Sequence, residues 1–95
     1  MARYISLLRF TDQGARNIKD SPARAVAFKK SAEKLGVTVE AQRWTAGRYD
    51  GILVLSGEEK SILRVLTQLA ALGNVRTETL QAFDADSLKA FTGGK

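Results

Sequence analysis

Residues 51–83 read GILVLSGEEKSILRVLTQLAALGNVRTETLQAF, and this stretch decides the fold. It starts with a short apolar run at 51–55, which is typical of a buried central strand. Apolar residues then recur with helical spacing opposite polar ones, and this pattern predicts a helix. The closing segment, 74–83, alternates and contains β-branched residues, so we expect a second strand there. The stretch therefore predicts one strand–helix–strand unit.

The predicted helix has recognisable ends. Ser56 and Glu59 form an S-x-x-E capping box, in which the hydroxyl and the carboxylate satisfy backbone N–H groups at the helix start. Gly73 stands where a left-handed residue would end the helix. The side chains expected to face the core are Ile62, Val65, Leu66, Leu69 and Leu72.

The first half of the chain also contains a strand and a helix. Residues 3–10, RYISLLRF, are rich in large apolar side chains and predict a strand. Ser21 followed by Pro22 predicts a helix start, with the hydroxyl as the cap, and this helix runs to Leu35. Gly36 then supplies its end. A narrow apolar stripe is expected to face the core: Ala25, Phe28, Ala32 and Leu35.

Three further segments complete the pattern. Residues 37–44 alternate, with Val39 and Ala41 on the same side, and predict a half-buried strand that ends at the single tryptophan. The polar stretch 12–20 predicts a short helical turn. Residues 84–95 form a tail that contains one more short helix.

The order β, α, β, β, α, β is the ferredoxin-like arrangement, an α+β fold in a single domain, 1–95. It predicts a four-stranded antiparallel sheet with both helices on one face. The other face is left uncovered, so we expect it to meet a second copy of the chain in a two-fold dimer. Tyr4, Leu8, Phe10 and Trp44 are expected there, and the gap between two such sheets would form a ligand pocket.

The composition excludes much standard catalytic chemistry. Because the chain has no cysteine and no histidine, it lacks thiolate nucleophiles, iron–sulfur ligands, an imidazole acid/base and histidine metal ligands. The acidic residues show no spacing typical of a calcium or magnesium site. We therefore expect neither a metal nor another cofactor.

The formal net charge of +5 raises the question of nucleic-acid binding. Residues 1–35 carry eight basic and three acidic side chains, so the excess lies in the first third. Lys29, Lys30 and Lys34 lack neighbouring aromatic stacking groups, and we interpret them as a solvated helix face rather than a nucleic-acid site. No apolar run reaches the length of a signal or membrane segment, so we expect a cytoplasmic protein with no membrane contact.

Four segments resemble, in order, the GYD domain family of small proteins: TDQG at 11–14, NIKDSP at 17–22, GRYD at 47–50 and LGNVRTETLQAF at 72–83. The family is named for its Gly-x-Tyr-Asp motif, which is complete here. The resemblance implies a ferredoxin-like fold of the dimeric α/β-barrel type and says little about activity. Proteins of this type include cofactor-independent oxygenases, isomerases, haem enzymes and ligand-binding regulators, and the absence of histidine argues against the haem branch.

The connection that carries the Gly-x-Tyr-Asp motif is the strongest candidate site. In a functional interpretation Tyr49 donates a hydrogen bond to a carbonyl or acts as an acid/base, Asp50 orients it or accepts a proton, and Arg48 contacts an anion. In the structural interpretation Gly47 permits a positive φ, Asp50 bonds turn N–H groups and Tyr49 packs over a sheet edge.

Two more pairs are candidates. Alternation places Arg76 and Glu78 on one face of the last strand, where they would offer an anion contact and a base in a cleft, or a surface or interface ion pair. Tyr4 and Trp44 would form an aromatic wall for a planar ligand, or pack in the core or an interface.

Two functions are consistent with these residues. The first is a homo-oligomeric module that binds a small ligand or serves as an interaction module. The alternative is a cofactor-independent enzyme of the oxygenase or isomerase type, acting on a small planar or carbonyl substrate through the catalytic candidates Tyr49, Asp50 and Glu78. The ligand-binding candidates are Tyr4, Trp44, Arg48, Tyr49 and Arg76.

Overall fold

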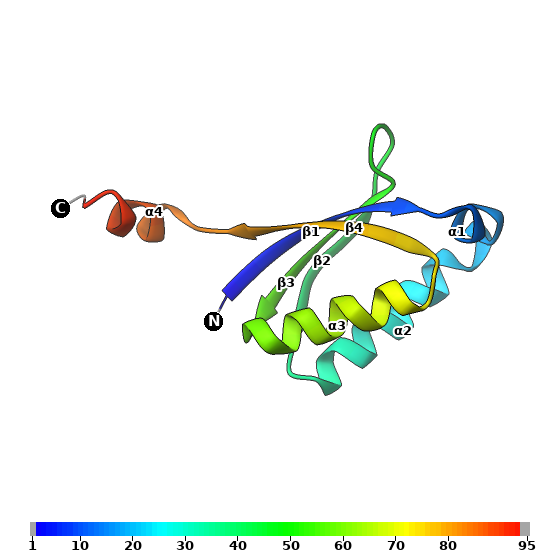
Figure 1. Ribbon diagram of the computed structural model, residues 1–95, viewed down its shortest axis with the longest axis horizontal. Coiled ribbons are helices and arrows are strands. Elements are labelled where there is room, and N and C mark those ends of the chain that lie inside the picture. The colour runs from blue at the N-terminus through cyan, green and yellow to red at the C-terminus, as the bar shows by residue number, and fades with distance from the viewer. Residues whose placement is uncertain (1, 94–95) are drawn as a thin grey trace.

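The sheet has four antiparallel strands in the order β2-β3-β1-β4 in a computed structural model that describes residues 2–93. The strands are β1 (Ala2–Phe10), β2 (Thr38–Trp44), β3 (Gly51–Gly57) and β4 (Val75–Ala82). The helices are α1 (Asp12–Arg16), α2 (Ser21–Lys34), α3 (Glu59–Ala71) and α4 (Ala85–Phe91), with a 3-10 turn at Ile18–Asp20. Both long helices, α2 and α3, lie on one face of the sheet (Figure 1), which confirms the predicted ferredoxin-like α+β architecture.

The core lies between this covered face and the two helices. Leu55 and Ile62 are essentially inaccessible to solvent, and the predicted apolar stripes of both helices pack around them. Leu72 is the exception, with 63% of its surface exposed, because α3 ends at Ala71 and the following residue turns away as the C-cap. Ser6 is a polar residue that is fully buried in this layer, and its hydroxyl lies 2.8 Å from that of Thr79.

Both predicted serine caps were wrong. Ser21 is the first residue of α2, and its Oγ accepts a hydrogen bond from Trp44 Nε1 at 2.9 Å, while Asp20 occupies the N-cap without a side-chain bond. Strand pairing with β1 continues as far as Gly57, so Ser56 lies inside β3 and cannot cap α3. The local sequence assigns both serines to helix starts. In the fold, Ser21 instead bonds Trp44 of β2, and Ser56 is paired with β1.

A β-bulge in β2 changes which side chains face the helices. Val39 is opposite Leu55, but the next paired residue is Ala41, opposite Val54. The extra residue reverses the alternation, so the prediction that Val39 and Ala41 share a face was wrong. Gln42 instead turns to α2, where its Nε2 donates to the Ala25 carbonyl at 3.0 Å.

The predicted contents of the two sheet faces were also wrong. Tyr4 and Leu8 pack against the core under the helices, and Phe10 and Trp44 line a cavity beside that core. Two of the four stripe residues of α2 are alanines, Ala25 and Ala32, so large side chains from the sheet fill the space beneath them. The uncovered face carries the other side of β1, with Ile5, Leu7 and their cross-strand neighbours.

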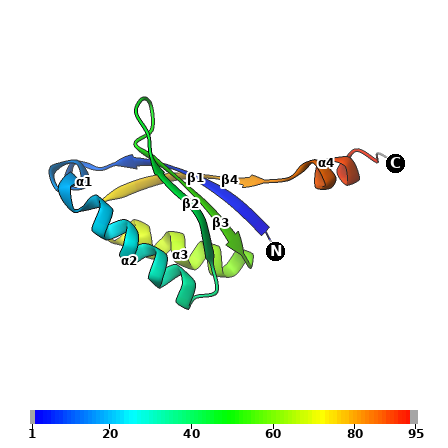
Figure 2. The same ribbon diagram turned by 180° about the vertical axis from the view of Figure 1, so that it is seen from behind.

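The chain leaves the sheet as an arm, residues 83–93, which includes α4. Figures 1 and 2 show this arm extending beyond the end of the sheet, away from α2 and α3. The radius of gyration is 14.5 Å, whereas a compact chain of this length has a radius of about 12 Å. Residues 94 and 95 of the predicted tail lie outside the described residues. Within residues 2–93, no helix is both long and apolar enough to cross a bilayer.

Candidate functional site

Two of the GYD-like segments bind each other at one end of the sheet. The Thr11 backbone N–H donates to the Asn74 carbonyl at 3.1 Å, and Gln13 Nε2 donates to Asn74 Oδ1 at 2.9 Å. At Gly14 a Cβ atom would lie only 2.0 Å from the Asn74 carbonyl oxygen, so this close approach requires glycine. The segments around residues 11–14 and 72–74 therefore form one corner of the fold.

The aspartate of the Gly-x-Tyr-Asp loop holds this loop at the same end of the sheet through hydrogen bonds to β1. Gly47 has φ +133°, which confirms the positive φ of the structural interpretation. The Asp50 backbone N–H donates to the Leu8 carbonyl at 2.8 Å, and Asp50 Oδ2 accepts from the Phe10 N–H, also at 2.8 Å. Asp50 thus bonds a strand N–H of β1 rather than the N–H groups of its own turn.

The neighbouring Tyr49 points to the uncovered face. Its hydroxyl donates to Glu78 Oε2 at 3.1 Å, and the Arg9 and Arg48 guanidinium carbons lie 5.1 and 5.9 Å from its ring centroid. Arg76 is directly opposite Arg9 in the pairing of β1 with β4. We call Arg9, Arg48 and Arg76 the arginine corner.

The structure therefore divides the predicted site residues. Tyr49 and Glu78 meet at the arginine corner, whereas Asp50 turns to the backbone of β1. Tyr4 packs against the core and Trp44 lines the cavity, so they form no common wall. Sequence reasoning missed Arg9, although its alternation with Ile5 and Leu7 places it on their face of β1.

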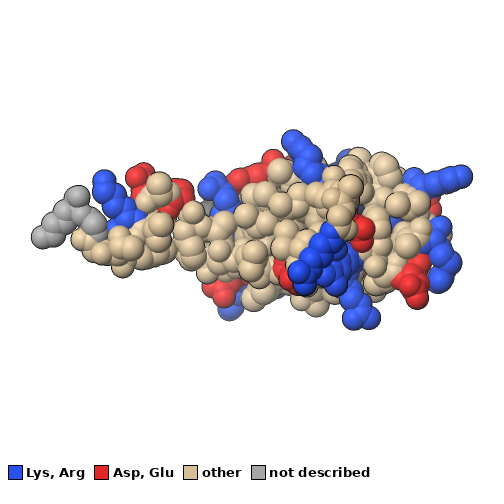
Figure 3. All heavy atoms as spheres, turned by 90° about the horizontal axis from the view of Figure 1, so that it is seen from above, with Lys and Arg blue, Asp and Glu red and all other residues tan. Residues whose placement is uncertain are grey.

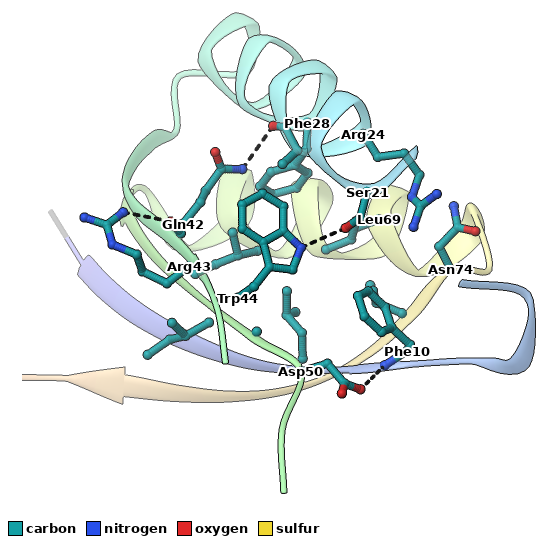
Figure 4. A pocket seen from close by; sticks show the side chains of 16 residues that line it. Phe10, Ser21, Arg24, Phe28, Gln42, Arg43, Trp44, Asp50, Leu69 and Asn74 are labelled. Carbon is teal, nitrogen blue, oxygen red and sulfur yellow. Dashed lines mark hydrogen bonds between the residues drawn. The ribbon is translucent and has the colours of Figure 1, made fainter. Parts of the chain in front are cut away.

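A cavity of about 80 Å³ lies between the sheet and the helices. Figure 4 shows the Trp44 indole at its centre beside Phe28, with Phe10 below them and Arg24 and Asn74 at one side. Trp44 keeps 52% of its surface exposed, so the cavity opens to solvent along the indole. Its walls are mainly apolar, and polar side chains stand around its rim, with Arg24 and Asn74 on one side and Gln42 and Arg43 on the other (Figure 4). Such a cavity suits a small flat molecule with a polar edge.

The uncovered face is arranged in cross-strand rows. One row joins Arg43, Ile52, Leu7 and Glu78, and the next joins Ala41, Val54, Ile5 and Leu80. Figure 3, seen from this side, shows a surface of mostly uncharged atoms with charged side chains gathered in a few places. The face thus has an apolar centre, with the arginine corner at one end.

An ion pair marks the other end of this face. Arg3 Nε lies 3.0 Å from Glu40 Oε1, and Arg3 also donates a hydrogen bond to the second carboxylate oxygen at 3.2 Å. A hydrogen bond from Ser56 and then the one from Arg3 hold the pKa of the Glu40 carboxyl below its ordinary value. Within residues 2–93, acidic side chains form no group of three or more that would hold a metal ion.

Relatives of the chain are found both by sequence and by fold. The GYD domain model matches residues 4–92, a range that includes all four GYD-like segments and α4. The chain belongs to the GYD domain family. This GYD protein is 34% identical, over 92 residues, to a Thermus thermophilus protein named glutamine synthetase and cystathionine beta-lyase binding protein, and the match covers 95% of this chain and 97% of that relative.

A solved structure also resembles this GYD chain. The crystal structure of TTHA0845 from Thermus thermophilus has a TM-score of 0.55 and 26% sequence identity, and the match covers 90% of this chain and 96% of that one. The match along nearly both whole chains supports the same ferredoxin-like fold. The family resemblance inferred from the four segments is therefore confirmed.

Proposed function

We propose that this GYD protein is an interaction module that self-associates through the uncovered sheet face. The observation that carries this proposal is the apolar centre of that face, where Ile5, Leu7 and Val54 are half-buried and Leu80 is 56% exposed in the single chain. A continuous apolar patch is uncommon on the surface of an isolated soluble protein and is typical of an interface.

The dimensions of the sheet fit a second copy. Strands lie about 4.8 Å apart and rise about 3.3 Å per residue, so the face offers about 500 Å² per copy. Two faces in contact would bury about 1,000 Å², which is near the lower limit of a stable interface. A two-fold axis would match the apolar rows of one copy with those of the other.

Protein partners beyond the second copy are supported by the relative named as a binding protein for two enzymes. We propose that this chain also binds enzymes, and the source organism's own glutamine synthetase and cystathionine beta-lyase are the first to test. Purified enzyme would be passed over the immobilised full chain. Saturable binding to either enzyme supports the proposal. Binding to neither enzyme overturns the proposed binding of enzymes.

Self-association is tested by native mass spectrometry and sedimentation velocity. We expect an even oligomer for the natural chain, and monomers for Val54→Lys, because the charge would be buried in the apolar centre. Leu63→Lys is the matched control, since Leu63 is 55% exposed on α3, on the other side of the molecule. A monomeric natural chain, or a Val54→Lys variant that assembles as well as the control, overturns the proposal.

The cavity beside Trp44 supports a second function, the binding of a small flat ligand with an anionic end. The apolar walls would hold the flat part, and the Arg24 guanidinium and the Asn74 amide, which stand together at one side of the cavity, would hold the anionic end (Figure 4). Trp44 is the single tryptophan of the chain, so its fluorescence reports on this cavity alone.

Benzoate is a suitable probe for this second function. A saturable change in Trp44 emission with benzoate, which Arg24→Ala weakens and which benzylamine does not produce, supports an anion-selective ligand site. Equal responses to benzoate and benzylamine, or none, overturn it. Turnover of a small carbonyl compound that is lost in Tyr49→Phe and Glu78→Gln would instead favour the cofactor-independent enzyme.

A further inference from the structure

The arm is a preformed element that leaves its apolar side chains in solvent. Asp84 Oδ1 accepts a hydrogen bond from the Ser87 N–H at 2.8 Å and so caps α4. Phe83 and Phe91 pack edge to face with ring centroids 4.9 Å apart, yet they are 54% and 64% exposed, and Leu88 is 59% exposed.

A seven-residue helix gains little stability on its own. None of the residues of α4 is buried, and the arm extends away from the covered core (Figures 1 and 2). Leu88 and Phe91 on this helix, and Phe83 just before it, stay exposed within the part of the chain that the structure describes, so they are free to pack against another surface.

The arginine corner, in contrast, has an excess of positive charge. Arg9 and Arg76 face each other across neighbouring strands, and like charges in this position destabilise the pair. Glu78 is the carboxylate found beside them, and it already accepts a hydrogen bond from Tyr49. Within residues 2–93, Arg3 and Glu40 form an ion pair shorter than 4.0 Å, whereas the three arginines of the corner form none.

The positions of these two features are complementary. Figure 1 shows the loop that carries Arg48 rising above the uncovered face at one end of the sheet, while the arm leaves from the opposite end. A two-fold axis that lies between two stacked sheets, at right angles to the strands, reverses the second copy end for end. The loop of each copy then stands beside the arm of the other, twice in one dimer.

We propose that the arm of one copy docks on the arginine corner of the second copy, with Asp86 facing Arg76 and Arg48. This inference rests on the proposed self-association and adds the direction of the two-fold axis. The start of the arm, residues 83–88, carries two aspartates and no basic side chain, so its charge is opposite to that of the corner. The two arms would also enlarge an interface that the sheets alone bring only to about 1,000 Å².

Disulfide trapping tests this contact without background, because the natural chain has no cysteine. An Arg76→Cys chain and an Asp86→Cys chain, each with a tag of different mass, are co-expressed and oxidised. Docking predicts that the mixed covalent dimer forms severalfold more than either same-variant dimer. The matched control pairs Asp86→Cys with Arg64→Cys, an exposed residue of α3 that would stay far from the partner's arm.

Charge reversal gives a second readout. Asp86→Arg should weaken the dimer about tenfold, equal to about 1.4 kcal/mol, and adding Arg76→Glu to the same chain should restore much of the loss.

The outcomes separate the two proposals. A natural dimer with no excess of the mixed 76/86 disulfide over the Arg64→Cys control overturns the docking of the arm and leaves the sheet interface standing. A monomeric natural chain overturns both. The mixed disulfide together with the charge rescue supports the docked arm.

Discussion

The two faces of the sheet differ in how far a single chain buries their side chains. On the covered face Leu55 is fully buried and Ser6 has its hydroxyl partner, so the contacts are complete within one chain. On the uncovered face Val54 and Ile5 are paired across strands but keep part of their surface in water. Since side chains alternate along a strand, consecutive residues of β3 serve different purposes. Folding depends on one set, and association would depend on the other.

The most direct way to break this comparison is to shorten two neighbours, Leu55 and Val54. Leu55→Ala should lower the free energy of unfolding by about 3 kcal/mol, because it leaves a cavity in the closed core. Val54→Ala should cost about 1 kcal/mol or less in the single chain, since the site is already open to water. Urea unfolding at a low protein concentration measures both.

The same two variants should rank in the reverse order in an association assay. Leu55→Ala is expected to keep the oligomer as long as it stays folded, whereas Val54→Ala is expected to weaken it. Sedimentation velocity over a range of concentrations provides the measurement. If both substitutions weaken folding equally and neither changes assembly, the two faces do not have separate roles.

A smaller effect is expected from the polar pair formed by the buried Ser6 and by Thr79 on the edge strand β4. Thr79→Val removes the partner of the buried Ser6 hydroxyl, which should cost about 1–2 kcal/mol because a buried donor is left unsatisfied. Adding Ser6→Ala should recover much of this loss, since the unpaired hydroxyl is then gone. Thermal unfolding of the two single variants and the double variant checks this, and strict additivity of the losses would contradict it.

The comparison also explains which parts of the fold could be predicted from the sequence. Element order, the helical stripes and the family followed from periodicity and from the four GYD-like segments, because these signals lie within one element each. The faces could not be assigned, because alternation separates Tyr4 and Leu8 from Ile5 and Leu7 without saying which set meets the helices. That choice depends on how the side chains of the sheet fit against the stripes of both helices, which is decided only when the layers pack together.

The errors at the candidate site have a related cause. The bulge at Glu40 changes which side chains of β2 face the helices, and no local residue pattern predicts this bulge. Ser21 and Ser56 carry cap-like signals that contacts from other elements override. The sequence placed Tyr49 and Arg48 in one candidate site and Arg76 and Glu78 in another. The hydrogen bond from Tyr49 to Glu78, and Arg9 beside that tyrosine, become visible only in the folded chain.

A still smaller change is expected at the arginine corner. Tyr49→Phe removes the exposed hydrogen bond to Glu78, and we expect a loss of about 0.5 kcal/mol or less in unfolding free energy, because water can replace the partner. The ring that the arginines approach is kept in this variant. Urea unfolding provides the test, with Asp50→Ala as the contrasting variant, since it would leave the Phe10 N–H of β1 without its acceptor and should cost more.

The smallest expected effect lies at the far end of the uncovered face, in the pH dependence of the Arg3–Glu40 pair. The pKa of Glu40 is lowered in the folded chain, first by Ser56 and then by Arg3, from an ordinary value of 4.5. A lowered folded pKa adds stability above the unfolded pKa, and this contribution is lost as the pH falls through the folded pKa. Glu40→Gln should therefore flatten the decline in unfolding free energy below about pH 4.5, and the difference from the natural chain should shrink as the pH drops. Because the pair lies on the surface, 1 M salt should weaken the effect of Arg3. Urea unfolding between neutral and acidic pH provides the measurement. If the unfolding free energy of the two chains declines equally at acidic pH, this end of the face contributes no pH-dependent stability.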